Sequence, residues 1–380
     1  ALERDQRALF DVIRDRVARD SAAAAERRAR EGGRPAPLWL NAGERVGQLS
    51  VAPDGRALLL TTVVPSTRAR TAQVPDWVTR SGYVEELPTR TKVGDDQTSG
   101  RVAFLPIAPQ SDTTARVRWL RVVPSDTARA AGSVQLLGWN DAGTHALVSA
   151  ERRDYKERVL SVVRADSGLV RTLDVLRDSA WVGGPCGGCG GWLPGDRGLW
   201  FVSEADGWAH LYTMRPDGSD RRQLTKGAWE VLDVALSPDR TRFRLHTSER
   251  SVFDRDHWEM ALDGTGRVRL TRDSGGHAAV RSPDGRRLAD VWSTANTPPE
   301  LYVSEARPGG TAPVRLTTSP SAEFRAQRWI VPEIVRIPGS DGVGVPARVY
   351  RPQDVGAAPN GAAVIFVHGA GYLHNVHNWW

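Results

Sequence analysis

The sequence has very little sulfur and very little lysine. Cysteine and methionine occur twice each in 380 residues, and only three of the 51 basic residues are lysines. Two cysteines are too few for a disulfide-rich scaffold, and without a second pair a four-ligand zinc site is not expected. The C-x-x-C spacing of Cys186 and Cys189 leaves two alternatives open, a small loop disulfide or two free thiols. We expect neither a metal nor a cofactor.

Long apolar runs are also missing, so the sequence predicts no membrane span, and no signal peptide is evident. The net charge is +6, but the arginines are scattered among 45 acidic residues instead of gathered in runs. This pattern argues against a nucleic-acid surface. The sequence begins at Ala1 without Met, inside a predicted helix, and therefore predicts a processed or truncated chain. Its compartment is unknown, with the periplasm or secretion favoured over the cytoplasm.

What the sequence does contain is a repeated phrase. The stretch from Trp192 to Thr225 predicts three or four short strands joined by Pro/Gly/Asp turns. Turn prolines recur at Pro194, Pro238 and Pro283, 44 and 45 residues apart, and the phrases ending in Thr225, Thr271 and Thr317 are 46 residues apart. This period is typical of four-stranded propeller blades, whereas unrelated turns in a β-sandwich carry no such period. Residues 38–330, divided by the period, predict an all-β propeller of seven or eight blades.

Two segments near the N-terminus depart from the repeat. Residues 1–37 predict a helix and a linker, with Leu9, Val12, Ile13 and Val17 forming an apolar stripe that packs on the main body. The stretch from Pro75 to Pro88 is an insertion with paired acids, and insertions on repeat scaffolds often carry binding residues.

The repeat stops after Ser319, and residues 331–380 predict the start of a second domain. A hairpin is expected from Glu333–Pro338 and Val345–Pro352. The continuously apolar segment Ala362–Val367 predicts a buried strand of an α/β sheet. Because the sequence stops at Trp380, we expect Val364–Val367 to lack sheet partners and to form an exposed apolar edge.

The segment after this predicted strand reads His368-Gly369-Ala370-Gly371-Tyr372. An H-G-x-G phrase at the end of a buried strand is typical of the oxyanion loop of α/β-hydrolases, where glycine lets backbone N–H groups approach a developing negative charge. Together with the propeller, this phrase predicts a truncated α/β-hydrolase domain.

The whole chain resembles the prolyl oligopeptidase family of serine peptidases, in particular its dipeptidyl peptidase IV branch. The resemblance rests on Ser203–Tyr212, which matches S-E-x-D-G-x-x-H-L-Y, on Ser340–Gly342, and on Val367–Tyr372 with Asn375–Trp380. It implies a propeller that admits short peptide substrates to a C-terminal α/β-hydrolase domain, and it allows a homodimer of the full-length protein. No G-x-S-x-G occurs in these 380 residues, so we expect this chain alone to be inactive.

The resemblance also implies roles for the segment around His368, which stands where that branch has an oxyanion-binding Tyr. The backbone from His368 through Gly369, with Tyr372 nearby, would take this role; the alternative is a glycine pair needed only for a turn. His374 and His377 form H-x-x-H, but without acidic ligands nearby we expect no metal there.

Acidic residues are the candidates for substrate binding. Glu85 and Glu86 follow a D-W-V phrase that resembles the one before the ammonium-binding glutamates of that branch. Six residues intervene here, so a solvated surface pair is the alternative. Glu204 is a further candidate, with turn contacts inside a blade as the alternative.

A function of another class is a stand-alone propeller that binds a protein partner without chemistry. The stretch Val364–Tyr372 separates the two hypotheses, since a scaffold has no use for an apolar strand followed by H-G-A-G-Y.

Overall fold

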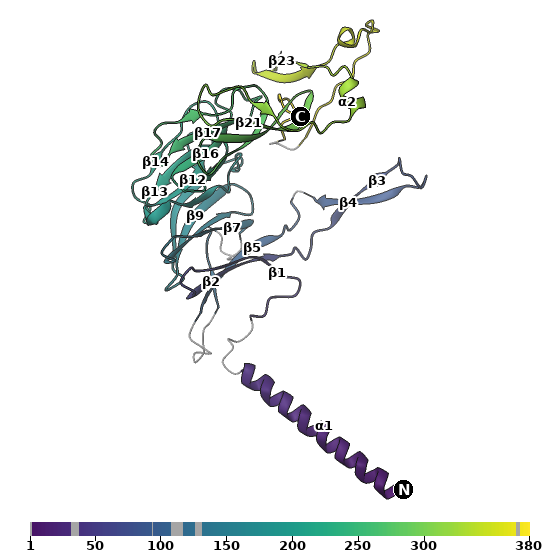
Figure 1. The fold of residues 1–380 in the computed structure, drawn as a ribbon, viewed down its shortest axis with the longest axis vertical. Coiled ribbons are helices and arrows are strands. Elements are labelled where there is room, and N and C mark those ends of the chain that lie inside the picture. The colour runs from purple at the N-terminus through teal and green to yellow at the C-terminus, as the bar shows by residue number, and fades with distance from the viewer. Residues whose placement is uncertain (1, 32–37, 93, 108–116, 126–130, 370–372) are drawn as a thin grey trace. The chain divides into compact units, whose positions relative to one another are not determined.

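The computed structural model describes residues 2–31, 38–92, 94–107, 117–125, 131–369 and 373–380. Strands make up most of the ordered elements (Figure 1), as the all-β prediction expects. The chain divides into two compact units, residues 1–153 with 162–171 and residues 154–161 with 172–380, and each is described by itself. No helix among the described residues is long and apolar enough to cross a membrane.

Five four-stranded sheets carry the repeat. The first has the order β1 (Arg45–Val51), β2 (Ala57–Val64), β5 (Ser99–Pro106), β6 (Arg118–Leu120), and the second contains β7 (Ser133–Trp139), β8 (His145–Glu151), β9 (Glu157–Arg164) and β10 (Val170–Arg177). The third contains β11 (Gly190–Trp192), β12 (Leu199–Ser203), β13 (His210–Met214) and β14 (Arg222–Gln223). The fourth and fifth contain β15 (Val231–Leu236), β16 (Arg242–Thr247), β17 (Asp256–Ala261), β18 (Val268–Arg269), β19 (Gly276–Arg281), β20 (Arg287–Thr294), β21 (Thr297–Glu305) and β22 (Val314–Arg315).

The prediction of seven or eight blades is not confirmed, because the described residues form five such sheets. The predicted number of blades was the length of residues 38–330 divided by the repeat period. The first sheet, however, spans more residues than one period. Its strands extend from Arg45 to Leu120 because a separate hairpin is inserted between β2 and β5. The predicted strands of the unit Trp192–Thr225 are confirmed as β11 to β14.

The inserted hairpin consists of β3 (Thr71–Asp76) and β4 (Glu85–Thr91), which form a two-stranded sheet and pair with no other strand among the described residues. It carries large apolar side chains that remain exposed, including Trp77, Val78 and Tyr83. The sequence prediction of an insertion in this stretch is therefore confirmed.

The third and fourth sheets share one hydrophobic core in the second compact unit. Phe243 is fully buried and meets Trp200 edge to face, with 5.9 Å between ring centroids. Leu211, Leu245 and Met260 are buried in the same cluster. Each sheet thus covers a face that its neighbour would otherwise expose, as the stacking of repeated units requires.

A polar contact recurs in the last three sheets, and we call it the blade latch: Thr225 with His210, Thr271 with Asp256, and Thr317 with Glu300. Each threonine hydroxyl bonds the side chain of a residue on the third strand. The hydroxyl also accepts the backbone N–H of the next residue on that strand, at 2.9–3.1 Å. The latch gives a physical reason for the threonine that ends each repeated phrase.

The latch in the third sheet also fixes a tautomer. His210 Nε2 lies 3.0 Å from the carbonyl oxygen of Gly227, which can only accept. A neutral His210 therefore carries its proton on Nε2 and accepts the Thr225 hydroxyl through Nδ1, at 3.0 Å.

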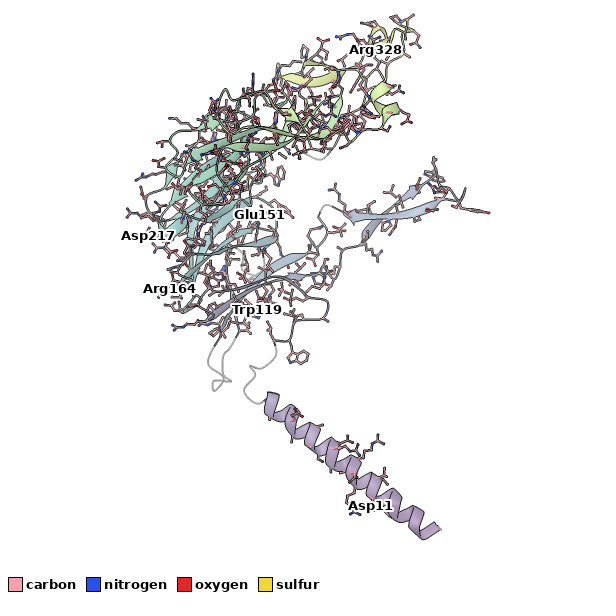
Figure 2. All side chains as sticks on the ribbon, viewed as in Figure 1. Asp11, Trp119, Glu151, Arg164, Asp217 and Arg328 are labelled. Atoms are coloured by element: carbon pink, nitrogen blue, oxygen red, sulfur yellow. A yellow bond between two sulfur atoms is a disulfide. The ribbon has the colours of Figure 1, made fainter. Side chains whose placement is uncertain are left out.

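The N-terminal helix α1 (Leu2–Glu31) forms as predicted, but the expected packing of its apolar stripe is wrong. Val12, Ile13 and Val17 of the predicted stripe are exposed, and the side chain of Leu9 lies outside the described part of the structure. Nearly all of the other α1 side chains that are described, among them Asp11 (Figure 2), are exposed as well. The apolar residues are confined to one part of the helix, and alanine and charged residues follow them, so the helix presents too short a stripe to pack.

After the last sheet, α2 (Ala322–Ala326) leads into the antiparallel hairpin β23 (Glu333–Pro338) and β24 (Gly344–Val349), which confirms the predicted hairpin. The predicted buried strand Ala362–Val367 is not formed, so the start of an α/β-hydrolase sheet is not confirmed. The expected exposure is confirmed, and Val364 is 99% exposed. A fully apolar strand depends on neighbours for its hydrogen bonds and its cover, and this segment pairs with no described strand.

Candidate functional site

The S-E-x-D-G phrase forms the turn between β12 and β13 in the second compact unit. Glu204 follows β12 directly, is half-buried, and accepts the Gly183 N–H at 3.3 Å. Asp206 accepts from the Gln223 side-chain amide at 2.6 Å and from the Trp208 N–H at 3.3 Å. Asp206 therefore has the structural role of a turn residue, whereas Glu204 reaches out to a neighbouring loop.

A second carboxyl group lies near Glu204. Burial and, after it, the negative charge of Glu204 raise the pKa of the Glu230 carboxyl, at the start of β15. Two carboxyl groups in mutual repulsion attract a proton or a cation. The sequence does not single out Glu230, because a single glutamate before a strand carries no signal of its own.

The loop that Glu204 holds contains the two cysteines. Cys186 and Cys189 form a disulfide, with 5.1 Å between their Cα atoms, which decides between the two alternatives that the sequence left open. A side chain at Gly184 would meet the Glu204 carboxylate, since an added Cβ would lie 2.2 Å from Oε1. A larger residue at Gly184 would therefore displace the Glu204 carboxylate from its present position.

A buried arginine joins this loop to β12. Arg158 donates from Nη1 to the Gly187 carbonyl oxygen and from Nη2 to the Val202 carbonyl oxygen, both at 2.7 Å. A guanidinium removed from water is stable only when such acceptors surround it. Its rigid two-pronged geometry fixes the position of the cysteine loop against the sheet.

Glu85 and Glu86 lie on the inserted hairpin, in the first compact unit, and both are exposed. They are the first two residues of β4, opposite Asp76 and Pro75 of β3. Neighbouring residues on a strand point to opposite faces, so the two carboxylates do not point to one side. Glu85 accepts from the Ser81 hydroxyl at 3.1 Å.

The predicted oxyanion loop is only partly described, and Tyr372 lies outside the described residues. His368 and Gly369 are exposed, and the His368 Nδ1 atom lies 2.9 Å from the Gly369 carbonyl oxygen. No atom crowds Gly369, since an added Cβ would meet nothing within 4 Å. The described residues do not test the oxyanion role of His368 and Gly369, which stays a prediction.

The residues after this loop are anchored to the second unit. Asn378 donates from Nδ2 to Asp254 Oδ1 and Ser274 Oγ, both at 3.1 Å, and its N–H bonds the Phe253 carbonyl oxygen at 2.8 Å. The ring of His377 stacks on Trp379 at 3.8 Å, and burial, followed by the charge of Arg348, lowers the pKa of His377 to about 4. His377 is thus a packed neutral side chain.

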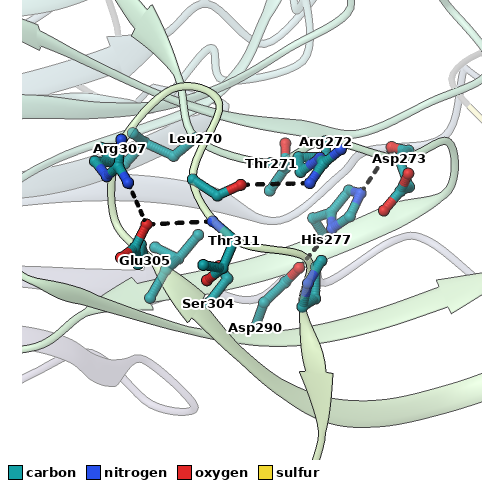
Figure 3. A pocket seen from close by; sticks show the side chains of 13 residues that line it. Leu270, Thr271, Arg272, Asp273, His277, Asp290, Ser304, Glu305, Arg307 and Thr311 are labelled. Carbon is teal, nitrogen blue, oxygen red and sulfur yellow. Dashed lines mark hydrogen bonds and ion pairs between the residues drawn. The ribbon is translucent and has the colours of Figure 1, made fainter.

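A small cavity lies between the loops of the fourth and fifth sheets (Figure 3). His277 bonds Asp290 at 2.6 Å there, and Arg307 pairs with Glu305 at 2.7 Å. The cavity measures about 10 Å³, enough for roughly one water molecule. Its polar groups are already paired in large part with one another, so the cavity is structural.

Comparison with known proteins identifies the family of this chain. The family model described as the dipeptidyl peptidase IV (DPP IV) N-terminal region matches residues 52–299, which run from just after β1 to the start of β21 and include strands of all five sheets. This chain belongs to that family. The resemblance stated from the sequence phrases is thereby confirmed for the DPP IV branch.

Solved structures of similar fold include two bacterial proteins. One is the dipeptidyl peptidase 4 of Porphyromonas gingivalis, with a TM-score of 0.58 and 18% identity over 80% of this chain and 41% of that one. The other, from Bacteroides ovatus, is described as a dipeptidyl aminopeptidase IV, with a TM-score of 0.56 and 17% identity over 80% of this chain and 46% of that one. At this identity the likeness concerns the fold, and this DPP IV N-terminal region spans less than half the length of either protein.

Proposed function

We propose that this chain is the substrate-gating propeller portion of a serine peptidase that hydrolyses short peptides, of the dipeptidyl or oligopeptidyl type. The observation that carries the proposal is the family match over residues 52–299, on sheets with the period and blade latch of a repeat. In this proposal the five sheets are propeller blades within residues 38–330, and residues 331–380 begin the hydrolase domain. For the complete propeller, seven or eight blades remains a prediction.

In the proposed enzyme, acidic side chains of the propeller bind the free N-terminal ammonium of the peptide. Glu86 is our first candidate, and Glu85 and Glu204 are separate alternative candidates, because a carboxylate binds an ammonium through charge-assisted hydrogen bonds. Glu85 already accepts from Ser81 and Glu204 from Gly183, so both are held in place.

The oxyanion would be held by the backbone N–H groups of the segment that contains His368, Gly369 and Tyr372. Such a loop needs the neighbouring strands of a hydrolase sheet to be rigid, and a nucleophile has to stand opposite it. We therefore propose that the chain of 380 residues is inactive alone. The disulfide at Cys186 and Cys189 supports an oxidising compartment, such as the periplasm or the cell exterior.

A paired assay tests the proposal. Fluorophosphonate labelling and hydrolysis of X-Pro and X-Ala dipeptide conjugates are measured on this chain and on the product of the full gene. We expect labelling and activity in the long product alone, and a KM raised about tenfold or more by Glu86→Gln with a smaller change in kcat. The exposed Glu323→Gln on α2 is the matched control.

Silence of both products would overturn the peptidase and favour a propeller that binds a protein partner. Activity of the short chain would overturn its proposed inactivity.

A further inference from the structure

The cysteine loop lies beside an acidic side chain of the next sheet. Asp233, on β15, has a side chain that is 65% exposed. The two sulfur atoms of Cys186 and Cys189 and a carboxylate oxygen of Asp233 all lie within 4.8 Å of one another. Two cysteines at C-x-x-C spacing with a third anionic side chain make up a set of ligands that zinc accepts.

We propose that the reduced form of this loop is a binding site for a thiophilic divalent cation such as Zn²⁺, held by Cys186, Cys189 and Asp233. Zinc binds thiolate sulfur at about 2.3 Å and carboxylate oxygen at about 2.0–2.2 Å, so ligand atoms around one ion stand roughly 3.3–3.8 Å apart. The three atoms are already within 4.8 Å, and the required adjustment is on the order of an ångström or two.

The loop can make this adjustment. Gly187 and Gly188 separate the cysteines, and Gly183 and Gly184 precede Pro185 and Cys186. Glycine gives the backbone freedom for the sulfurs to separate from bonding distance to the spacing around an ion. Arg158 bonds the carbonyl oxygen of Gly187, between the two cysteines, and keeps that residue against the sheet while the sulfurs move.

The charges around the loop also favour a cation. The buried Arg158 guanidinium lies next to the loop, and a neighbouring positive charge favours thiolate over thiol. Two thiolates and the Asp233 carboxylate bring three negative charges, and the Glu204 carboxylate also lies against this loop, so the single guanidinium charge leaves an excess of negative charge that a divalent cation reduces. Without the metal, the reduced site would leave its negative charge only partly compensated.

In the disulfide form the two sulfur atoms are bonded to each other and do not ligate the metal. A dithiol reductant supplies two electrons and two protons, converts the disulfide to two thiols, and is itself oxidised to a disulfide. Metal binding then releases the two thiol protons to solvent as the sulfurs ligate as thiolates. Because the Asp233 side chain is largely exposed, the metal reaches the site from solvent, and water takes the fourth position.

The test uses the unmodified chain in two redox states. One sample is kept oxidised, and another is reduced with a dithiol that is then removed under anaerobic conditions; both are titrated with Co²⁺, a spectroscopic substitute for Zn²⁺. We expect a sulfur-to-cobalt charge-transfer band in the near ultraviolet, saturating at one ion per chain, in the reduced sample alone. Added Zn²⁺ should displace the cobalt and abolish the band.

Two variants and a fold control complete the experiment. Asp233→Asn should weaken cobalt binding about tenfold or more, whereas Asp239→Asn, on an exposed turn, should leave it unchanged. Circular dichroism verifies that the reduced chain keeps its strand signal. No charge-transfer band in the reduced chain, or a loss of strand signal with or without metal, would overturn the proposal; equal affinity of Asp233→Asn and the unmodified chain would remove Asp233 from the site.

Discussion

The fourth sheet, β15 to β18, and the inserted hairpin, β3 and β4, use similar strands under different cover. In the sheet, Phe243 and Leu245 are buried against side chains of the neighbouring sheet. In the hairpin, Trp77 is 75% exposed and Val78 is 91% exposed. Pairing of strands alone therefore leaves apolar surface in water, and the repeat contributes stability by supplying a neighbour for each face.

Truncation of a core side chain should produce the largest difference between the two regions. Phe243→Ala removes a fully buried ring and leaves a cavity, so we expect a loss of about 3–5 kcal/mol in the free energy of unfolding. Trp77→Ala in the hairpin should change it by less than about 0.5 kcal/mol. Urea unfolding followed by circular dichroism measures both, and similar losses for the two variants would contradict the comparison.

The sequence predicted the strands of the repeated sheets better than the contacts between residues of different sheets. The period between Thr225, Thr271 and Thr317 reports a local contact that every unit repeats, so it is visible in one sequence. Pairs such as Glu204 with Glu230 join residues of two different sheets. They depend on how the sheets stack, and no spacing in the sequence encodes that. The segment Ala362–Val367 has the composition of a strand, but a strand also needs partners.

Buried histidines in the fourth sheet should make the stability of the chain depend on pH. Burial, and next the charges of His246, Arg244, Arg281 and His277, lower the pKa of His257 in the fourth sheet to about 3. The unfolded chain, with a histidine pKa near 6.5, binds a proton that the folded chain refuses, so stability falls as the pH falls from about 6.5 toward 3. The expected slope for one such group is about 1.4 kcal/mol per pH unit.

His257→Gln should remove that slope, measured as urea unfolding at several pH values, while the exposed His368→Gln serves as the control. His246, whose pKa burial also lowers, adds to the slope of both proteins. Burial opposes protonation of His277, but the hydrogen bond and charge of Asp290 outweigh it and raise its pKa, so His277 acts in the opposite direction. Equal slopes for the unmodified chain and His257→Gln would exclude a neutral, buried His257.

The smallest effect is expected from the blade latch, in which a buried threonine can be compared with an exposed one. Thr271→Val keeps the shape of a buried side chain but leaves the Asp256 carboxylate and the His257 N–H without the hydroxyl, which should cost about 1–3 kcal/mol. Thr317 is exposed, so water can replace its hydroxyl, and Thr317→Val should cost less than about 1 kcal/mol. Differential scanning calorimetry measures both; a larger loss for Thr317→Val would show that burial does not set the strength of the latch.

The latch has a consequence for how such proteins change over evolutionary time. Each of its hydrogen bonds joins the third strand of a sheet to the segment just after the fourth strand of the same sheet, from residues fewer than twenty positions apart. A duplicated or deleted segment of one period carries its own latch with it and leaves the hydrogen bonds of other sheets intact. The chain can therefore gain or lose whole repeats by single genetic events, after which the contacts between neighbouring sheets, apolar faces and polar links such as Arg158 to Val202, have to readjust.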